Sequence, residues 1–172
     1  MPSQYNNLLI DDQHIKLILE AANWAPTHKK TEPWRFKVLR GITKNELGDF
    51  LAAKYKESAS VFSEFKHNKI MEKAKKSSAI ILICMQRDPK KSVPEWEEIA
   101  AVSMSVQNMW LMATDLKIGS YWSSPKFINV IDQFIPLNQG ERCLGIFYMG
   151  QHDEKINHRI PGPIENKTLW YE

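Results

Sequence analysis

The apolar run "AIILICM", Ala79 to Met85, constrains the fold of this chain more than any other segment. It has no alternating polar positions, so both of its faces need cover from other parts of the chain, as in the interior of a sheet. The run is too short for a membrane span, which requires about 20 apolar residues. A chain of 172 residues can build one core around such a strand. We therefore expect a single domain, residues 1–172, and a cytoplasmic protein with no membrane partner, because no signal-peptide pattern opens the chain.

Helices and strands are expected in mixed order along the rest of the chain. Asp11 or Asp12 can cap a first helix, whose apolar positions follow three-four spacing until Pro26 stops it. The segment 34–38 alternates apolar and charged residues, which predicts a strand with one buried face. The other expected elements are a helix capped by Thr43, a helix at 61–76, a helix at 94–117, a helix that begins at Pro125 and a strand at 143–150. This order predicts an α+β fold.

The segment 94–117 is the longest expected helix and the most apolar. Residues such as Val102, Val106 and Met109 form one stripe at helical spacing. Trp96 and Met104 widen the apolar surface beyond what one contact face needs. Such a helix is either central in the fold or shared with another subunit.

Several classes of protein lack support in this sequence. No GxxxxGK[ST], GxGxxG or GxSxG motif is present, which argues against common nucleotide-binding loops and serine hydrolases. The histidines form no HExxH or Cys/His cluster, so no metal site is expected. Cys84 and Cys143 lie in strand-like runs and are expected to be buried, inert thiols. A net charge of +3 is too small to indicate a nucleic-acid partner.

Two charged patterns each have a structural and a functional interpretation. The acids of "EWEE", Glu95 to Glu98, are either paired catalytic carboxylates or first-turn residues that favour the positive end of the helix dipole, and we expect the second. Lysines at 66, 69, 73 and 76 recur on one helix face. They form either an anion-binding stripe or a solvated surface, and we again expect the second.

Two loops concentrate hydrogen-bond donors beside tryptophan. The segment "EAANWAPTHKKTEPWRF", Glu20 to Phe36, places histidine, lysines and threonines between two indoles, and "SYWSS", Ser120 to Ser124, repeats the pattern with hydroxyls. The indoles of these loops are explained either by ordinary packing or by a ligand pocket. The residues alone leave both explanations open.

The first loop resembles a known family in the arrangement "A-P-x-H-K-x-x-x-P-W-x-F", Ala25 to Phe36. The similarity continues through "VPEWEEIAAVSMSVQNMWLMATDLKIGSYWSSP" and "LGIFYMG" and so covers most of the chain. The family is the nitroreductases, FMN-dependent NAD(P)H oxidoreductases. The resemblance implies an α+β fold with a central, mostly antiparallel sheet flanked by helices, and a homodimer that binds FMN where its subunits meet. It also implies electron transfer from NAD(P)H through the flavin to nitroaromatic, quinone or similar small acceptors.

The resemblance assigns candidate cofactor-binding residues by position. Trp24 and His28 match a loop that touches FMN in the family, and Lys29 and Thr31 are its neighbours. The later flavin contact falls on Trp122, Ser123 and Ser124, and residues 112–117 lie near where the nicotinamide nucleotide is received. No catalytic side chain is implied, because FMN carries the chemistry in such enzymes.

The beginning of the chain departs from the family pattern. Family members usually carry an "R-R-S-x-R"-like segment that grips the FMN phosphate, and here only Ser3 and Gln4 lie near that place. One hypothesis is that Met1 is not the natural start and that the chain is truncated relative to the family. The other is that tight flavin binding is lost, which would leave a non-catalytic dimeric binding or interaction module.

Overall fold

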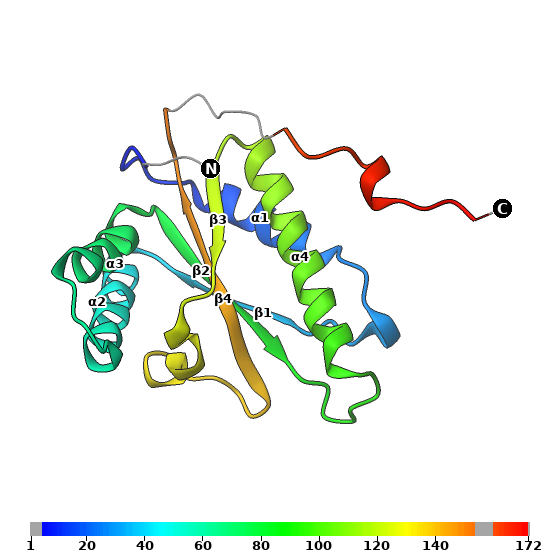
Figure 1. The fold of residues 1–172 in the computed structure, drawn as a ribbon, viewed down its shortest axis with the longest axis horizontal. Coiled ribbons are helices and arrows are strands. Elements are labelled where there is room, and N and C mark those ends of the chain that lie inside the picture. Colours follow the sequence, from blue (N-terminus) through cyan, green and yellow to red (C-terminus); the bar gives the residue numbers. More distant parts are fainter. Residues whose placement is uncertain (1–4, 154–159, 172) are drawn as a thin grey trace.

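The computed structural model describes residues 5–153 and 160–171 and shows one four-stranded antiparallel sheet (Figure 1). The strands follow the spatial order β1-β2-β4-β3. Their bounds are Trp34–Leu39 for β1, Ala79–Gln86 for β2, Gly119–Ser123 for β3 and Glu141–Gly150 for β4. The predicted α+β fold with a mostly antiparallel sheet is therefore confirmed.

Helices cover both faces of the sheet. Figure 1 shows α2 and α3 side by side against one part of the sheet, and α1 and α4 against another. The α-helices are α1 (Asp12–Asn23), α2 (Gly41–Ser58), α3 (Glu64–Lys76) and α4 (Glu95–Asp115). Short 3-10 helices are η1 (His28–Lys30), η2 (Lys126–Gln133) and η3 (Glu165–Lys167). No helix of the described residues combines the length and the hydropathy that crossing a membrane demands.

Strand β2 is the interior strand that the apolar run predicts. It pairs with β1 on one side and β4 on the other, and its residues from Ala79 to Met85 are all buried. Ile81 and Ile83 face the α1 and α4 layer, while Ile80 and Leu82 face α2 and η2. An uninterrupted apolar run fits this place because helices exclude water from both faces.

Some helix boundaries differ from the sequence expectation. Asp11 caps α1 as expected, because its side chain accepts from the Gln13 N–H at 2.6 Å. The helix expected from 61 begins only at Glu64, after Ser63 accepts a capping hydrogen bond from the Lys66 N–H. The cap expected at Thr43 is wrong, since α2 already begins at Gly41, whose φ of 54° suits glycine. The helix expected after Pro125 is the irregular 3-10 helix η2.

The prediction of one buried face on β1 is only partly correct. Val38 should lie on the buried face, yet it is 39% exposed, near the end of β1, which is an edge strand. Lys37 should be exposed, yet it is half-buried and donates to the Glu141 carboxylate at 2.5 Å. Leu39 is buried on the α2 side. Tertiary contacts thus override the alternating pattern at both positions.

The segment 160–171 extends away from the body of the chain (Figure 1). Its apolar side chains are exposed, including Ile164 at 67%, Leu169 at 79% and Trp170 at 89%. Large apolar side chains gathered on one exposed segment mark a surface that another molecule covers.

Candidate functional site

Two of the acids at the start of α4 have arginine partners. Glu98 is buried and binds the Arg87 guanidinium, and its other oxygen accepts from the Asp88 N–H at 2.9 Å. Glu95 pairs with Arg142 at 3.0 Å on the surface. Their expected place in the first turn of a helix is confirmed, and the buried pair fixes the beginning of α4 against the end of β2.

The loop after α1 is held in shape from within. The Thr27 and Thr31 hydroxyls lie 3.0 Å apart, and the Glu32 N–H donates to Thr27 Oγ1 at 3.3 Å. Lys29 adopts a φ of 52° and donates from Nζ to the Ser92 carbonyl at 2.8 Å, which ties the loop to the segment before α4. Backbone strain at such a position persists only when its surroundings hold it, so this loop has a defined conformation.

The two tryptophans of this loop have different environments. Trp34 is buried at the start of β1, and its indole N–H donates to Asn23 Oδ1 at 3.2 Å. Trp24 is 79% exposed, and its N–H donates to Glu20 Oε1 at 3.2 Å. Trp34 is therefore a structural anchor, whereas Trp24 presents an uncovered aromatic surface next to the loop.

His28 connects the loop to α4. Its Nδ1 lies 2.5 Å from Glu97 Oε2, and its side chain is 58% exposed. A carboxylate at Nδ1 fixes the ring by accepting the Nδ1 proton, which leaves Nε2 to interact with a ligand. Local sequence patterns could not predict the contact between Glu97 and His28, because the two residues are 69 positions apart.

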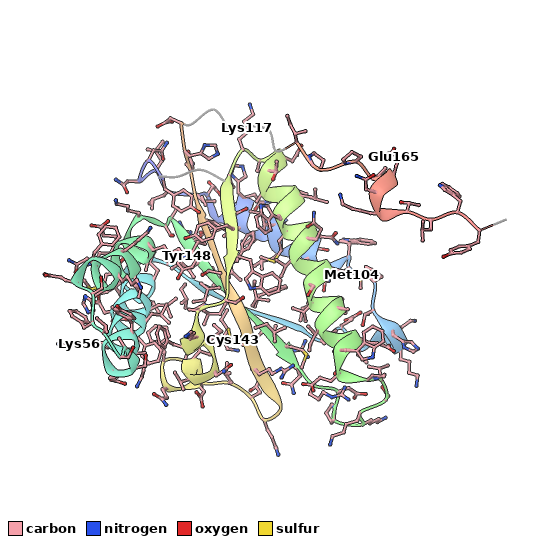
Figure 2. The ribbon with its side chains drawn as sticks, in the orientation of Figure 1. Lys56, Met104, Lys117, Cys143, Tyr148 and Glu165 are labelled. Atoms are coloured by element: carbon pink, nitrogen blue, oxygen red, sulfur yellow. The ribbon has the colours of Figure 1, made fainter. Side chains whose placement is uncertain are left out.

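A cavity of about 320 Å³ lies where the loop meets α4. Apolar atoms dominate its wall, and its residues are Pro26, Thr27, His28, Trp96, Glu97, Ala100, Ala101 and Met104. Figure 2 shows Met104 on the side of α4 away from the sheet. Of the residues that the resemblance assigns to the cofactor, His28 is part of this wall. Trp96 and Met104 belong to the apolar surplus that the sequence already shows on this helix.

The second predicted group lies on β3. Trp122 packs closely against β4, since a Cβ built on Gly145 would lie 1.8 Å from the indole Nε1. That Nε1 is buried without a hydrogen-bond partner among the described residues, as is the hydroxyl of Ser120 on the same face of the strand. Ser123 Oγ accepts from Lys73 Nζ at 3.4 Å, and Ser124 Oγ lies 3.5 Å from the Leu144 carbonyl.

The two predicted groups do not meet within one chain. Figure 1 shows the loop with η1 and the strand β3 on opposite sides of α4. The wall of the His28 cavity contains no residue of β3. Ser3 and Gln4, which the resemblance places near the phosphate-binding segment of the family, lie outside the described residues.

The lysine stripe on α3 is solvated only in part. Lys66, Lys69 and Lys76 are exposed, as expected. The expectation is wrong for Lys73, whose Nζ lies 4.7 Å from the ring centroids of both Tyr121 and Tyr148. Burial, and to a lesser degree the charge of Lys69, lowers the pKa of the Lys73 ammonium. Contacts between the aromatic rings and the cation explain why this lysine turns inward.

Known proteins match this sequence and this fold. A sequence profile of the Nitroreductase family matches residues 3–151. The chain belongs to the Nitroreductase family. This nitroreductase is 30% identical over 153 residues to the Bacillus subtilis protein YfhC. The match covers 87% of this chain and 78% of YfhC. The name of YfhC assigns it provisionally to the NAD(P)H nitroreductases.

Solved structures agree with this assignment. A nitroreductase-like protein from Bacillus cereus matches with a TM-score of 0.81 and 25% identity, over 99% of this chain and 90% of its own. A nitroreductase from Desulfovibrio desulfuricans, solved in complex with FMN, matches with a TM-score of 0.70 and 24% identity, over 98% of this chain and 90% of its own. The predicted family and its fold are thereby confirmed.

Proposed function

We propose that this nitroreductase is an FMN-dependent oxidoreductase that uses NAD(P)H to reduce nitroaromatic, quinone or similar small acceptors. Family membership and the name of YfhC support the reaction class, and the FMN complex of the Desulfovibrio structure supports the cofactor. Bound FMN would accept a hydride from NAD(P)H and pass electrons to the acceptor. The chain itself has to bind and orient the reactants and limit the access of water.

The cavity beside His28 carries this proposal, because its residues have the chemistry that a flavin requires. An isoalloxazine ring needs apolar planes and a few donors near its ring oxygens and nitrogens. Trp96, Met104 and the alanines of α4 supply apolar walls, and Thr27 and His28 supply polar groups. Glu97 keeps the imidazole in one orientation, so a contact from His28 would be made without a further loss of side-chain freedom.

Other residues would complete the site from elsewhere. The unpartnered Nε1 of Trp122 is a donor that lacks an acceptor in the described part of the chain, and burial without a partner costs about 1–3 kcal/mol. Because this Nε1 is turned toward Gly145, Trp122 would offer the flavin its ring rather than a hydrogen bond. Lys29 and Thr31 would act near the phosphate end, and Trp24 would cover the ring. Ser123 and Ser124 would offer hydroxyls from the end of β3.

We further propose that the functional unit is a homodimer. Three apolar side chains on α4, spaced eight and then seven residues apart, are exposed: Trp96 at 67%, Met104 at 40% and Leu111 at 61%. A helix that is apolar on both its inner and outer faces is normally covered on both. A second copy placed on this face would also bring its own segment 160–171 within reach of the first. It could unite the His28 cavity of one copy with β3 of the other.

A reconstitution experiment tests the cofactor and the reaction together. The purified chain is mixed with excess FMN, desalted and examined for flavin absorbance, and NAD(P)H oxidation is then followed after addition of a nitroarene. We expect bound flavin and acceptor-dependent oxidation. A protein that binds FMN but gives no turnover would refute the proposed reaction and leave the proposed cofactor standing. A dimer that retains no flavin would support the alternative of a binding or interaction module.

A further inference from the structure

The two cysteines face each other on the opposite side of the sheet from the His28 cavity. Cys84 on β2 and Cys143 on β4 are register partners in an antiparallel pair. Both belong to the apolar cluster beneath α2 and η2, so their side chains share one face of the sheet. Partners in such a pair have Cα atoms about 4.5–5.5 Å apart, within the usual disulfide range of about 4.4–6.8 Å. The backbone therefore already has a spacing that a bond between the two sulfurs requires.

A β-bulge adjoins this pair. Ile83 pairs with Gly145 and Cys84 with Cys143, so Leu144 is an extra residue on β4. Bulges interrupt the ladder and increase the local twist. The Cys143 thiol also points toward the Gly145 carbonyl across the bulge, at 3.4 Å. The pair thus lies where the sheet is least regular, rather than in the middle of an even ladder.

A buried ion pair borders the two thiols. Lys37 Nζ on β1 donates to Glu141 Oε1 on β4 at 2.5 Å, so this contact crosses β2 on the face that carries Cys84. A hydrogen bond between the thiols is the largest influence on both of them: it raises the pKa of Cys84 and lowers the pKa of Cys143. Burial and the Glu141 charge oppose the downward shift of the Cys143 pKa, and the Lys37 charge lowers the pKa of both thiols, but the net direction is down for Cys143 and up for Cys84. Of the two sulfurs, Cys143 is therefore the one favoured as a thiolate.

A second cavity reaches the same thiol. It encloses about 300 Å³ and is lined by Ile128, Asn129, Asp132, Leu137, Asn138, Glu141, Arg142 and Cys143. Cys84 is fully buried, whereas Cys143 is 6% exposed and forms part of this wall. Figure 2 shows Cys143 on β4 near η2. A small polar oxidant in this cavity can therefore approach Cys143, whereas Cys84 is not part of the wall.

We propose that Cys143 and Cys84 form a reversible disulfide when hydrogen peroxide enters this cavity. The Cys143 thiolate attacks one peroxide oxygen, the O–O bond breaks, and Cys143 becomes a sulfenic acid while the departing hydroxide takes up a proton to form water. The Cys84 sulfur then attacks the Cys143 sulfur, and the S–O bond breaks to release a second water. Two thiols and one peroxide give one disulfide and two waters. Burial of both thiols confirms the sequence prediction, but their arrangement argues against the inertness that was expected with it.

Peptide mapping of the oxidised protein tests this site without any flavin. The full-length chain is reduced, freed of reductant, treated with increasing hydrogen peroxide, and then unfolded in the presence of an alkylating reagent. We expect alkylation of both cysteines to be lost together, with a new peptide pair joined between Cys84 and Cys143 that dithiothreitol separates. The site would be refuted if both thiols stayed open to alkylation, if cysteine acids accumulated without this bridge, or if the bridge joined two chains.

Two reciprocal variants test the order of the steps. In Cys84→Ala, Cys143 should stop at the sulfenic acid and be trapped by dimedone after peroxide treatment. In Cys143→Ala, Cys84 should remain a thiol at the same peroxide dose. The opposite pattern would refute Cys143 as the attacking residue. Circular dichroism of each variant shows whether it folds, and the peptide map of the unaltered chain decides the existence of the bridge if either does not.

Discussion

The inner and outer faces of α4 are both apolar, but only one of them is covered. Toward the sheet, Val102, Val106 and Met109 are buried in the apolar cluster that α4 shares with α1 and the sheet. Away from it, Met104 and Leu111 are exposed, and the cavity beside His28 opens on the same side. The inner face stabilises the domain by itself. The outer face is apolar like a core but is exposed, which is why we propose that a second copy of the chain covers it.

The same contrast separates two neighbouring acids. Glu98 is buried in a pair with Arg87 and belongs to the fold, whereas Glu97 is partly exposed and orients His28 at the cavity. Position on the helix, rather than residue type, decides which glutamate supports the domain and which one supports the site. Variants on the two faces should therefore change different properties of the protein.

The largest effect on stability is expected from Glu98→Ala. Removal of this carboxylate leaves the Arg87 guanidinium, which is only 20% exposed, without its partner, and breaking a buried pair typically costs about 3–5 kcal/mol. Glu97→Ala is the matched control and should cost less than about 1 kcal/mol, because the pair with His28 is exposed. Urea unfolding of both variants measures the difference. Equal losses would show that the two acids are not distinguished as we describe.

The two methionines of α4 offer a second comparison. Met109→Ala removes a fully buried side chain and should lower the free energy of unfolding by about 2–5 kcal/mol at any protein concentration. Met104→Ala alters the outer face, so its effect should be small and should depend on protein concentration, as expected for an interface. Unfolding curves at several concentrations distinguish the two. A loss from Met104→Ala that is independent of concentration would place this residue in the core of the single chain.

A charge on the outer face should separate the subunits. Leu111→Glu places a carboxylate in the proposed interface and should weaken the dimer by about 2 kcal/mol or more, roughly 30-fold in the dissociation constant. Ile42→Glu on α2 is the control, because Ile42 is also exposed, at 72%, but lies on another helix. Analytical ultracentrifugation reads the oligomeric state of each variant. Dissociation by both variants, or by neither, would argue against α4 as the interface.

The smallest effect is expected from Glu97→Gln. The amide keeps the size of the side chain but holds His28 less firmly, and one weakened hydrogen bond of about 0.5–1.5 kcal/mol lowers FMN affinity about two- to tenfold. Thermal stability should hardly change, because the pair is exposed. Glu95→Gln is the control in the same turn, since Glu95 pairs with Arg142 and not with His28. Flavin fluorescence titration compares them, and equal affinities would remove Glu97 from the site.

Local patterns predicted the fold well where one interaction dominates. The apolar run 79–85 identified the interior strand, and Asp11 identified the cap of α1. That α4 is shared with another subunit stays a prediction. Prediction failed where a residue distant in the sequence determines the burial of a side chain. Lys37 is half-buried because it donates to Glu141, which lies on a strand two positions away in the sheet. Lys73 points inward because its ammonium contacts the rings of two tyrosines. Neither partner is visible from the local pattern.

The candidate site was predictable in part for the same reason. The donors and indoles around His28 mark the loop, and the resemblance assigned it to FMN. The contact between His28 and Glu97, and the meeting of the loop with Trp96 and Met104, depend on tertiary folding. All the assigned cofactor contacts stay predictions, namely Trp24, His28, Lys29, Thr31, Trp122, Ser123 and Ser124, as does the hypothesis of a longer natural N-terminus.

Sedimentation velocity of the FMN-treated protein, recorded at a flavin absorption band, tests the central claim most directly, because it reports cofactor and assembly at once. If α4 joins two copies around a flavin site, the flavin signal should sediment with a dimer that carries one FMN per chain. Flavin that sediments with a single chain would contradict the shared site. A dimer that sediments without flavin would contradict the proposal that the protein binds FMN.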